Sequence, residues 1–134
     1  MEKNTIIMVI EKSDDSFDAY SDNCDGIYAG GKDIPEVKKN TYEAIEALKR
    51  NLPEERWPEQ LKGDYEIEWK LDVPSFLEYY SNFMSLAGME RATGINQKQL
   101  SNYLNHRAVP RRRQAERIMN GIHKFASELM SITL

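Results

Sequence analysis

The sequence predicts an α+β protein made of two small domains, a β-β-β-α-β domain over residues 1–73 and an all-α domain over residues 74–134. Three observations support this fold class. Short apolar runs and period-two alternation, which are typical of strands, occur before Pro74. After Pro74, apolar residues are spaced three and four apart, as on one face of a helix. The net charge also changes sign near Pro74.

Charge is divided unevenly along the chain. Residues 1–74 carry ten Lys and Arg against eighteen Asp and Glu, a net charge of −8, whereas residues 75–134 carry eight against four, a net charge of +4. No stretch approaches the roughly 20 apolar residues of a membrane span, and the start Met-Glu-Lys-Asn lacks the apolar core of a signal peptide. The single cysteine, Cys24, cannot form an internal disulfide. We therefore expect a soluble, cytoplasmic protein.

Strand patterns dominate the N-terminal domain. Residues 6–10 form a continuous apolar, β-branched run, which predicts a central strand buried on both faces. Residues 17–20 and 27–29 are shorter strand candidates separated by the polar segment 22–26. Residues 65–73 alternate apolar and charged side chains with strict period two, which predicts a half-buried fourth strand.

One helix is predicted between the third strand and the fourth. Asp33 is suited to cap this helix, with Glu36 three residues later, and Pro53 stops it. The apolar residues between them repeat at three and four residues and predict one buried stripe: Ile34, Val37, Thr41, Ala44, Ile45, Leu48 and Leu52. We predict a loop over residues 53–63, with Trp57 folded back on the domain.

A helix, a glycine turn and a second helix are predicted over residues 89–104. Gly94 stands where the chain leaves the first helix, in a conformation that glycine adopts readily. Ile95 is expected to fill the angle between the helices. Asn96 is expected to cap the second helix, with Gln99 completing a capping-box-like pair. This is the pattern of a helix-turn-helix unit that binds DNA.

The second helix of this unit has an inner and an outer face. Leu100, Tyr103 and Leu104 fall at helical spacing and are expected to face inward. Four outer side chains are candidates for reading base edges in the major groove, where Gln and Asn pair bidentately with adenine: Gln97, Lys98, Ser101 and Asn102. A plain packing hairpin is the alternative interpretation. Glu90 replaces the small residue common in such units, so the first helix could be rotated.

Positive charge follows directly after the second helix. Beside a helix that enters the groove, such side chains could contact the flanking phosphates, which position a protein without reading sequence. The candidates for phosphate contacts are Asn105, Arg107, Arg111, Arg112 and Arg113. A solvated helix start is the alternative interpretation of the arginine run.

Two further helices frame the helix-turn-helix unit. The first is predicted from Ser75 to Phe83, opened by a capping box of Ser75 and Glu78. The second is long, and Gly121 within it indicates a close helix approach. Its broad apolar stripe predicts core packing, with surplus surface that could also build a homodimer: Ile118, Met119, Ile122, Phe125, Ala126, Leu129 and Met130.

The chain resembles a HicB-type antitoxin of a type II toxin–antitoxin system over nearly its full length. The resemblance rests on GIYAGG at 26–31, on TGINQKQLS at 93–101 and on Pro110-Arg111. The family's more usual Pro-Asp-Leu-Pro-Gly-Cys element reads SDNCDG at 21–26 here. The resemblance implies that the N-terminal domain is a partly degraded ribonuclease-H-like fold and that the C-terminal helix-turn-helix binds DNA.

The resemblance also implies partners. The N-terminal domain would bind and neutralise a HicA-type toxin, a small basic mRNA-cleaving ribonuclease, and the C-terminal domain would repress its own operon on double-stranded operator DNA. Family members form dimers or larger assemblies, which implies a homodimer or higher homo-oligomer. An acidic domain is a plausible mask for a basic nuclease, because opposite fields speed encounter. The acidic candidates for toxin contacts are Asp22, Asp25, Glu66 and Glu68.

Two other classes of function compete with this one. In an enzyme the acidic residues would hold Mg²⁺ for hydrolysis, but most lie in or beside one turn region, and neither His106 nor His123 has a local ligand partner. We therefore expect no catalytic residues, no metal and no cofactor. The second competitor is a stand-alone transcriptional regulator whose N-terminal domain senses a small ligand or only dimerises. Such a small domain has little room for a deep pocket.

Overall fold

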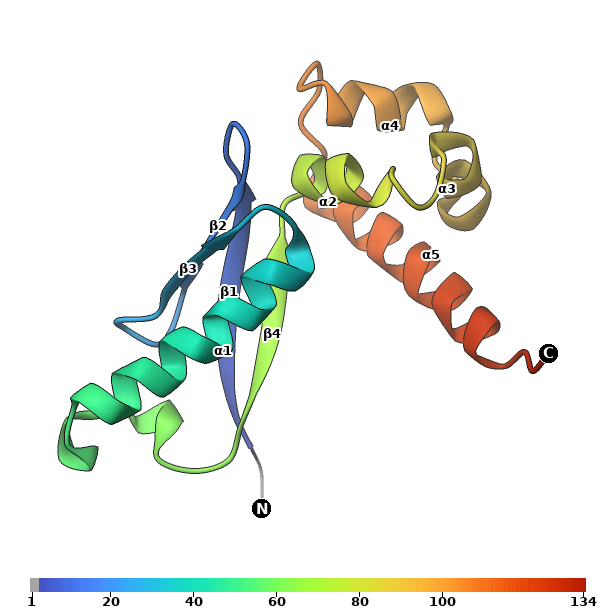
Figure 1. The fold of residues 1–134 in the computed structure, drawn as a ribbon. Coiled ribbons are helices and arrows are strands. Elements are labelled where there is room, and N and C mark those ends of the chain that lie inside the picture. The colour runs from blue at the N-terminus through green and yellow to red at the C-terminus, as the bar shows by residue number, and fades with distance from the viewer. Residues whose placement is uncertain (1–2) are drawn as a thin grey trace. The chain divides into compact units, whose positions relative to one another are not determined.

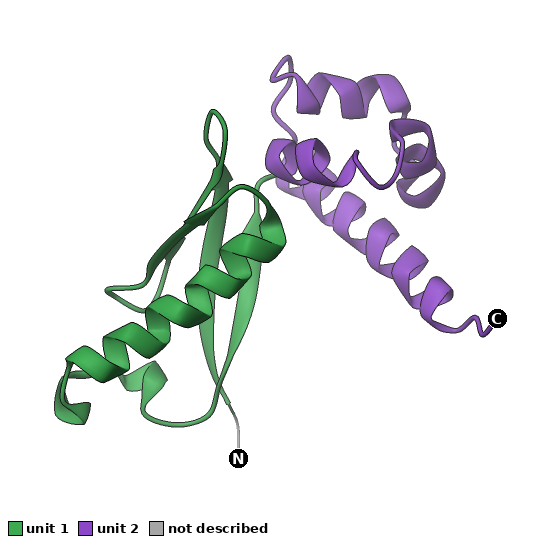
Figure 2. Ribbon diagram, viewed as in Figure 1, with its two compact units in different colours: residues 1–72 green, residues 73–134 purple. Residues whose placement is uncertain are grey.

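The computed structural model describes residues 3–134, and it is an α+β structure. Within these residues it contains a four-stranded mixed sheet and five α-helices (Figure 1). The chain divides into two compact units, and it passes from unit 1 to unit 2 between Asp72 and Val73 (Figure 2). The sequence places the boundary one residue later, at 73/74.

Unit 1 follows the predicted order β-β-β-α-β. Its elements are β1 (Asn4–Lys12), β2 (Phe17–Ser21), β3 (Tyr28–Gly31), α1 (Ile34–Asn51) and β4 (Tyr65–Leu71), with two short 3₁₀ turns, Glu54–Arg56 and Glu59–Leu61, between α1 and β4. The strand order in the sheet is β3-β2-β1-β4. β1 pairs antiparallel with β2 and parallel with β4, so the central position predicted for β1 is confirmed.

β1 is buried on one face rather than on both, which corrects the prediction. Ile6, Met8 and Ile10 have no exposed surface, whereas Ile7 and Val9, which alternate with them, are only half-buried. The reason is that unit 1 has one α-helix, α1, and this helix covers one face of the sheet (Figure 1). The apolar run therefore has two apolar faces, of which α1 covers one.

The start and the end of α1 agree with the sequence signals. The Oδ1 atom of Asp33 accepts a hydrogen bond from the backbone N–H of Glu36 at 2.8 Å. The Glu36 carboxylate in turn accepts from the N–H of Lys32 at 3.3 Å, one residue before the position of a capping box. The helix ends at Asn51, two residues before Pro53. The cap by Asp33 satisfies one of the amide groups that a helix start leaves without intrahelical partners.

Unit 2 is built from four helices. They are α2 (Val73–Tyr80), α3 (Leu86–Thr93), α4 (Gln97–Leu104) and α5 (Arg112–Met130). Their apolar faces enclose one core, which contains Leu77, Met89, Ile95, Leu100, Tyr103 and Ile118. The inward faces predicted for Leu100 and Tyr103 are thus confirmed, and Leu104 is half-buried at the edge of this core.

The predicted start and end of α2 are wrong. The helix begins at Val73, so Ser75 lies inside it, where it is buried and cannot act as the N-cap. The helix ends at Tyr80, and Phe83 lies beyond it with 74% of its surface exposed. Pro74 explains the earlier start, because proline fits the first turn of a helix, where its missing N–H has no intrahelical acceptor. Ser85 instead caps α3, accepting from Gly88 N–H at 3.0 Å.

Only the first half of the apolar stripe on α5 packs into the core. Ile118 is buried and Ile122 is half-buried, whereas Phe125 is 37%, Leu129 57% and Met130 86% exposed. The predicted core packing thus holds for the first half of the stripe, and the second half is the surplus apolar surface that its width indicates. The close approach predicted at Gly121 is confirmed: a Cβ on Gly121 would lie 2.6 Å from the carbonyl oxygen of Ala92 in α3.

Candidate nucleic-acid interface

The turn between α3 and α4 is fixed by three consecutive residues. Gly94 ends α3 with a φ of +76°, the left-handed region that favours glycine, and its N–H donates to the carbonyl of Glu90 at 2.7 Å. The hydroxyl of Thr93 donates to the carbonyl of Met89 and accepts the N–H of Ile95 at 3.1 Å. Ile95 is 2% exposed and fills the angle between the helices, as predicted.

Two side chains bind the amides at the start of α4. The Oδ1 atom of Asn96 accepts from Lys98 N–H at 2.7 Å, so the predicted N-cap is confirmed. The carboxylate of Glu90, one turn before the end of α3, accepts from Gln97 N–H at 2.6 Å. Gln99 does not cap the helix; its Oε1 atom accepts a long hydrogen bond from Asn102. Glu90 thus provides the second capping group that was expected of Gln99.

The four predicted base-reading residues differ in exposure. Gln97 and Lys98 are exposed, whereas Ser101 and Asn102 are half-buried. Gln97, Lys98 and Ser101 line one shallow groove together with Leu86 and Glu90 of α3 and with Asn96. Asn102 is not part of this groove, and its amide is engaged by Gln99 at 3.4 Å. The N-terminal half of α4 is therefore the part that offers free polar side chains.

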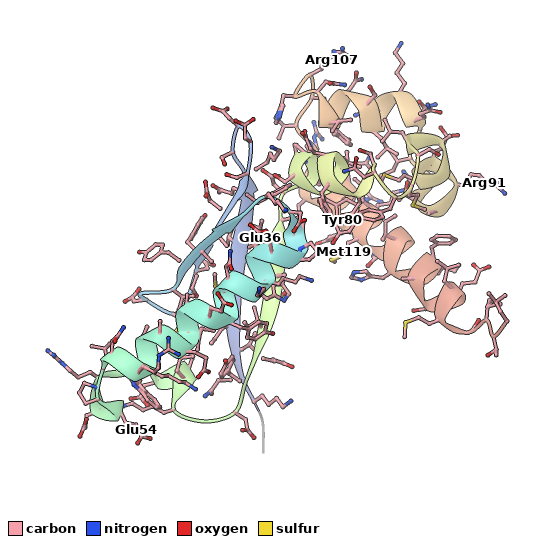
Figure 3. All side chains as sticks on the ribbon, viewed as in Figure 1. Glu36, Glu54, Tyr80, Arg91, Arg107 and Met119 are labelled. Carbon is pink, nitrogen blue, oxygen red and sulfur yellow. The ribbon has the colours of Figure 1, made fainter. Side chains whose placement is uncertain are left out.

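The predicted phosphate contacts do not form one cluster. Asn105 ends α4, and its amide donates to the carbonyl of Ser101 at 2.9 Å, so this side chain is already used. Arg107 is exposed in the loop after α4 (Figure 3). This loop turns through His106, which has a φ of +59°. Arg112 forms an exposed pair with Glu116 at 3.2 Å, an interaction weak enough for a phosphate to displace.

A second groove joins two of the predicted arginines to two cations that the sequence analysis did not name. Arg111 lines it together with Arg113, Arg117 and Lys124 of α5, and the other lining residues include Thr93, Gly121 and one acid, Glu116. Arg117 also donates to the carbonyl of Gly94 at 2.9 Å, which ties α5 to the turn. The spacing of 113, 117, 120 and 124 places these positions on one helix face, a signal that could have identified Arg117 and Lys124.

The acidic candidates of unit 1 lie in two places. Glu66 and Glu68 are exposed on β4, and Asp22 and Asp25 are exposed after β2. Asp25 lies beside Cys24, which is 2% exposed; burial above all, and then this carboxylate, raises the pKa of the Cys24 thiol. Within residues 3–134, no group of three or more His, Cys, Asp or Glu side chains is arranged to hold a metal ion.

No family model, curated protein or solved structure matches the chain. None of the helices in the described part is long and apolar enough to cross a membrane. What the protein does is therefore inferred from its own residues and their charges.

Proposed function

We propose that the protein is an antitoxin of the HicB type. In this proposal unit 1 binds and neutralises a HicA-type toxin, a basic mRNA-cleaving ribonuclease. Unit 2 binds double-stranded operator DNA through a helix-turn-helix formed by α3 and α4 and represses the operon that encodes both proteins. The protein acts by binding in both roles and has no catalytic residues of its own.

One observation carries this proposal, the separation of charge between two compact units. Unit 1 has a net charge of −8 and unit 2 a net charge of +4. A basic ribonuclease and a DNA duplex have opposite charges, so one protein that binds both needs two surfaces of opposite sign. In unit 2, the exposed Gln97 and Lys98 at the start of α4 support DNA binding. Both side chains are of the kinds that reach base edges in the major groove.

The resemblance to HicB-type antitoxins supports the same proposal. The residues that carry it in unit 2, 93–101, form the buried turn and the capped start of α4. Unit 1 combines four strands with one helix in the order β-β-β-α-β. That order supports a reduced ribonuclease-H-like fold.

We further propose that the functional form is a homodimer joined through the C-terminal half of α5. Ile118, Ile122, Phe125 and Leu129 are separated by four, three and four residues, the spacing of a seam between two helices. The core of unit 2 buries only the first of these and half of the second. The α5 helix of a second copy has the same spacing, so the two helices can pack along this seam. A two-fold dimer also suits operators whose half-sites lie about one helical turn apart.

The test is expression in the native host. The products of the genes that flank this chain's gene are expressed alone and together with this chain, and growth and mRNA integrity are followed. We expect growth arrest and mRNA cleavage in the first case, with both reversed in the second, and repression of a reporter placed behind the chain's own promoter. Neighbouring products that are all harmless alone, or a toxic one that this chain does not silence, would overturn the antitoxin assignment.

A further inference from the structure

The sheet of unit 1 has a second face that α1 does not cover. On the covered face, the ring of Trp69 in β4 meets Tyr42 of α1 edge-on at 6.2 Å, and the Lys38 ammonium lies 5.5 Å from its centre. Side chains alternate between the two faces of a strand. The residues next to Trp69 in β4, and those beside Met8 in β1, therefore point to the other face. We call this the open face.

The register of the sheet aligns two tyrosines and a valine across the middle of the open face, with Lys70 at the β4 end of this row. Tyr28 of β3 pairs with Tyr20 of β2, Tyr20 pairs with Val9 of β1, and Val9 pairs with Lys70 of β4. Tyr28, on the edge strand β3, is 73% exposed, and Tyr20, within the sheet, is 38% exposed. Exposed tyrosines beside an apolar strand are enriched at protein interfaces, where their rings are buried and their hydroxyls remain hydrogen-bonded.

Rows of carboxylates lie on both sides of this aromatic row. On one side, Glu11 of β1 pairs with Asp18 of β2. On the other side, Ile7 pairs with Glu68 of β4, and its carbonyl accepts the N–H of Asp22 at 2.9 Å. Glu66 lies one further row along β4, where it accepts a 3.5 Å hydrogen bond from Thr5.

The Glu11 carboxylate accepts a hydrogen bond from the Tyr20 hydroxyl at 3.3 Å. Its negative charge is the largest cause of the raised pKa of the Tyr20 phenol. Burial, this hydrogen bond and Asp22 add to the increase. The negative potential of the acidic rows thus reaches the central row of the face. Asp25 lies outside these rows, in the turn before β3.

We propose that the open face is the surface on which unit 1 binds a basic protein, and hence that it is the toxin-binding surface of the proposed function, on which this inference rests. Nucleic acid and anionic membranes carry the same charge as the face and are repelled by it. A second copy stacked by the same face would oppose like carboxylates. A basic protein surface instead pairs with the outer carboxylates while its apolar centre covers the tyrosine row.

The experiment measures the affinity of this chain for a small basic HicA-type ribonuclease taken from the genes that flank its own, purified in a catalytically inactive form. Two full-length variants alter the open face, Glu11→Lys/Glu68→Lys and Tyr28→Ala. The matched control is Glu43→Lys/Glu55→Lys, which makes the same change in net charge at exposed positions of α1 and of the first 3₁₀ turn. Circular dichroism confirms that each variant is folded. Protection from hydrogen exchange on binding locates the contact independently of any substitution.

We expect each open-face variant to weaken binding about tenfold or more, and the control to change it by less than about threefold. Protection from exchange is expected in β1 and β2 rather than in α1. If the unchanged chain binds while both open-face variants bind equally well, the open face is not the docking surface and the antitoxin function stands. If the unchanged chain does not bind at all, both the proposed function and this inference are wrong.

Discussion

The carboxylate of Glu90 in α3 accepts a hydrogen bond from the backbone N–H of Gln97, the first residue of α4, at 2.6 Å. A helix start attracts anions, and in many proteins it binds a phosphate directly. Here the protein's own carboxylate occupies that position. In the proposed complex with DNA, the side chains of Gln97 and Lys98, rather than the amides of α4, would therefore meet the duplex. Glu90 stands where a small residue is usual in helix-turn-helix units, and this hydrogen bond is how its larger side chain is accommodated.

Replacing Glu90 by Gln separates the negative charge of this side chain from its hydrogen bond to the start of α4. The variant keeps a hydrogen-bond acceptor but removes the charge that favours the helix start, so we expect it to lose about 0.5 to 1 kcal/mol of unfolding free energy. It also removes one negative charge from the groove that Gln97 lines. Binding to operator and to random DNA should then strengthen alike. Weaker binding to both duplexes, measured on folded protein, would contradict the expectation that the Glu90 charge opposes DNA binding.

Gly121→Ala tests the contact between α3 and α5. The added Cβ would lie 2.6 Å from the Ala92 carbonyl oxygen and 2.7 Å from Thr93 Cα, both backbone atoms that cannot yield without moving a helix. We expect a loss of about 1 to 3 kcal/mol in chemical denaturation. Gly88→Ala is the control, because its Cβ would meet only side-chain atoms, at 3.3 and 3.4 Å. Alanine has the higher helix propensity, so the control should not lose stability, and an equal loss in both variants would contradict the role given to the close approach at Gly121.

Gln97→Ala and Arg112→Ala are expected to weaken DNA binding in different ways. Gln97 is exposed at the start of α4, so its loss should remove about 1 to 3 kcal/mol of discrimination at one operator position. Arg112 should contribute only charge, so its loss should weaken binding to all sequences alike and lower the salt slope by about one unit. Fluorescence anisotropy with operator and random duplexes across a salt series measures both. Equal weakening by Gln97→Ala on both duplexes would exclude base reading.

Leu129→Glu tests the proposed dimer. Leu129 is 57% exposed in the described chain, so a charge there should leave the monomer folded while disrupting a seam between two α5 helices. We expect light scattering to give the mass of a monomer for this variant and of a dimer for the unchanged protein. Ser127→Glu places the same charge on another face of α5 and should remain dimeric. A dimer that survives Leu129→Glu would move the interface elsewhere.

The pH dependence of stability has one contribution that can be isolated. Because burial raises the pKa of the Cys24 thiol, the folded state favours the protonated form. This contribution is complete below the thiol's ordinary pKa and is lost as the pH rises through the higher pKa of the folded state. As the pH rises above the thiol's ordinary pKa of about 8.5, Cys24→Ala should therefore lose less of its stability than the unchanged protein does. Identical slopes for the two proteins would contradict the linkage.

Signals that act over a few residues predicted the structure well. The cap by Asp33, the left-handed turn at Gly94 and the cap by Asn96 each depend on one side chain or one dihedral angle. Strict alternation likewise predicted β4, whose side chains alternate between half-buried and exposed. In each case the sequence itself contains the atoms that form the interaction. No distant partner is needed to decide the outcome.

The errors arose where burial depends on the size of a partner element. The sequence does not show where the apolar stripe of α5 leaves the core, which depends on α3: this helix packs on α5 and has eight residues against nineteen, about 12 Å against 28 Å of helix. Val9 is half-buried for the same reason, because unit 1 has one α-helix for two sheet faces. Periodicity identifies an apolar face and leaves open whether another element is long enough to cover it.

The most direct measurement of the central claim is recovery of this chain from its native host with whatever remains bound after a moderate-salt wash, followed by mass spectrometry. Such a wash removes loose electrostatic contacts between exposed charges. We predict a small basic protein in near-equal amount that is toxic when expressed alone and silenced by this chain. Recovery of DNA alone, with no such protein, would contradict the antitoxin function and leave unit 1 as a sensor or dimerisation module.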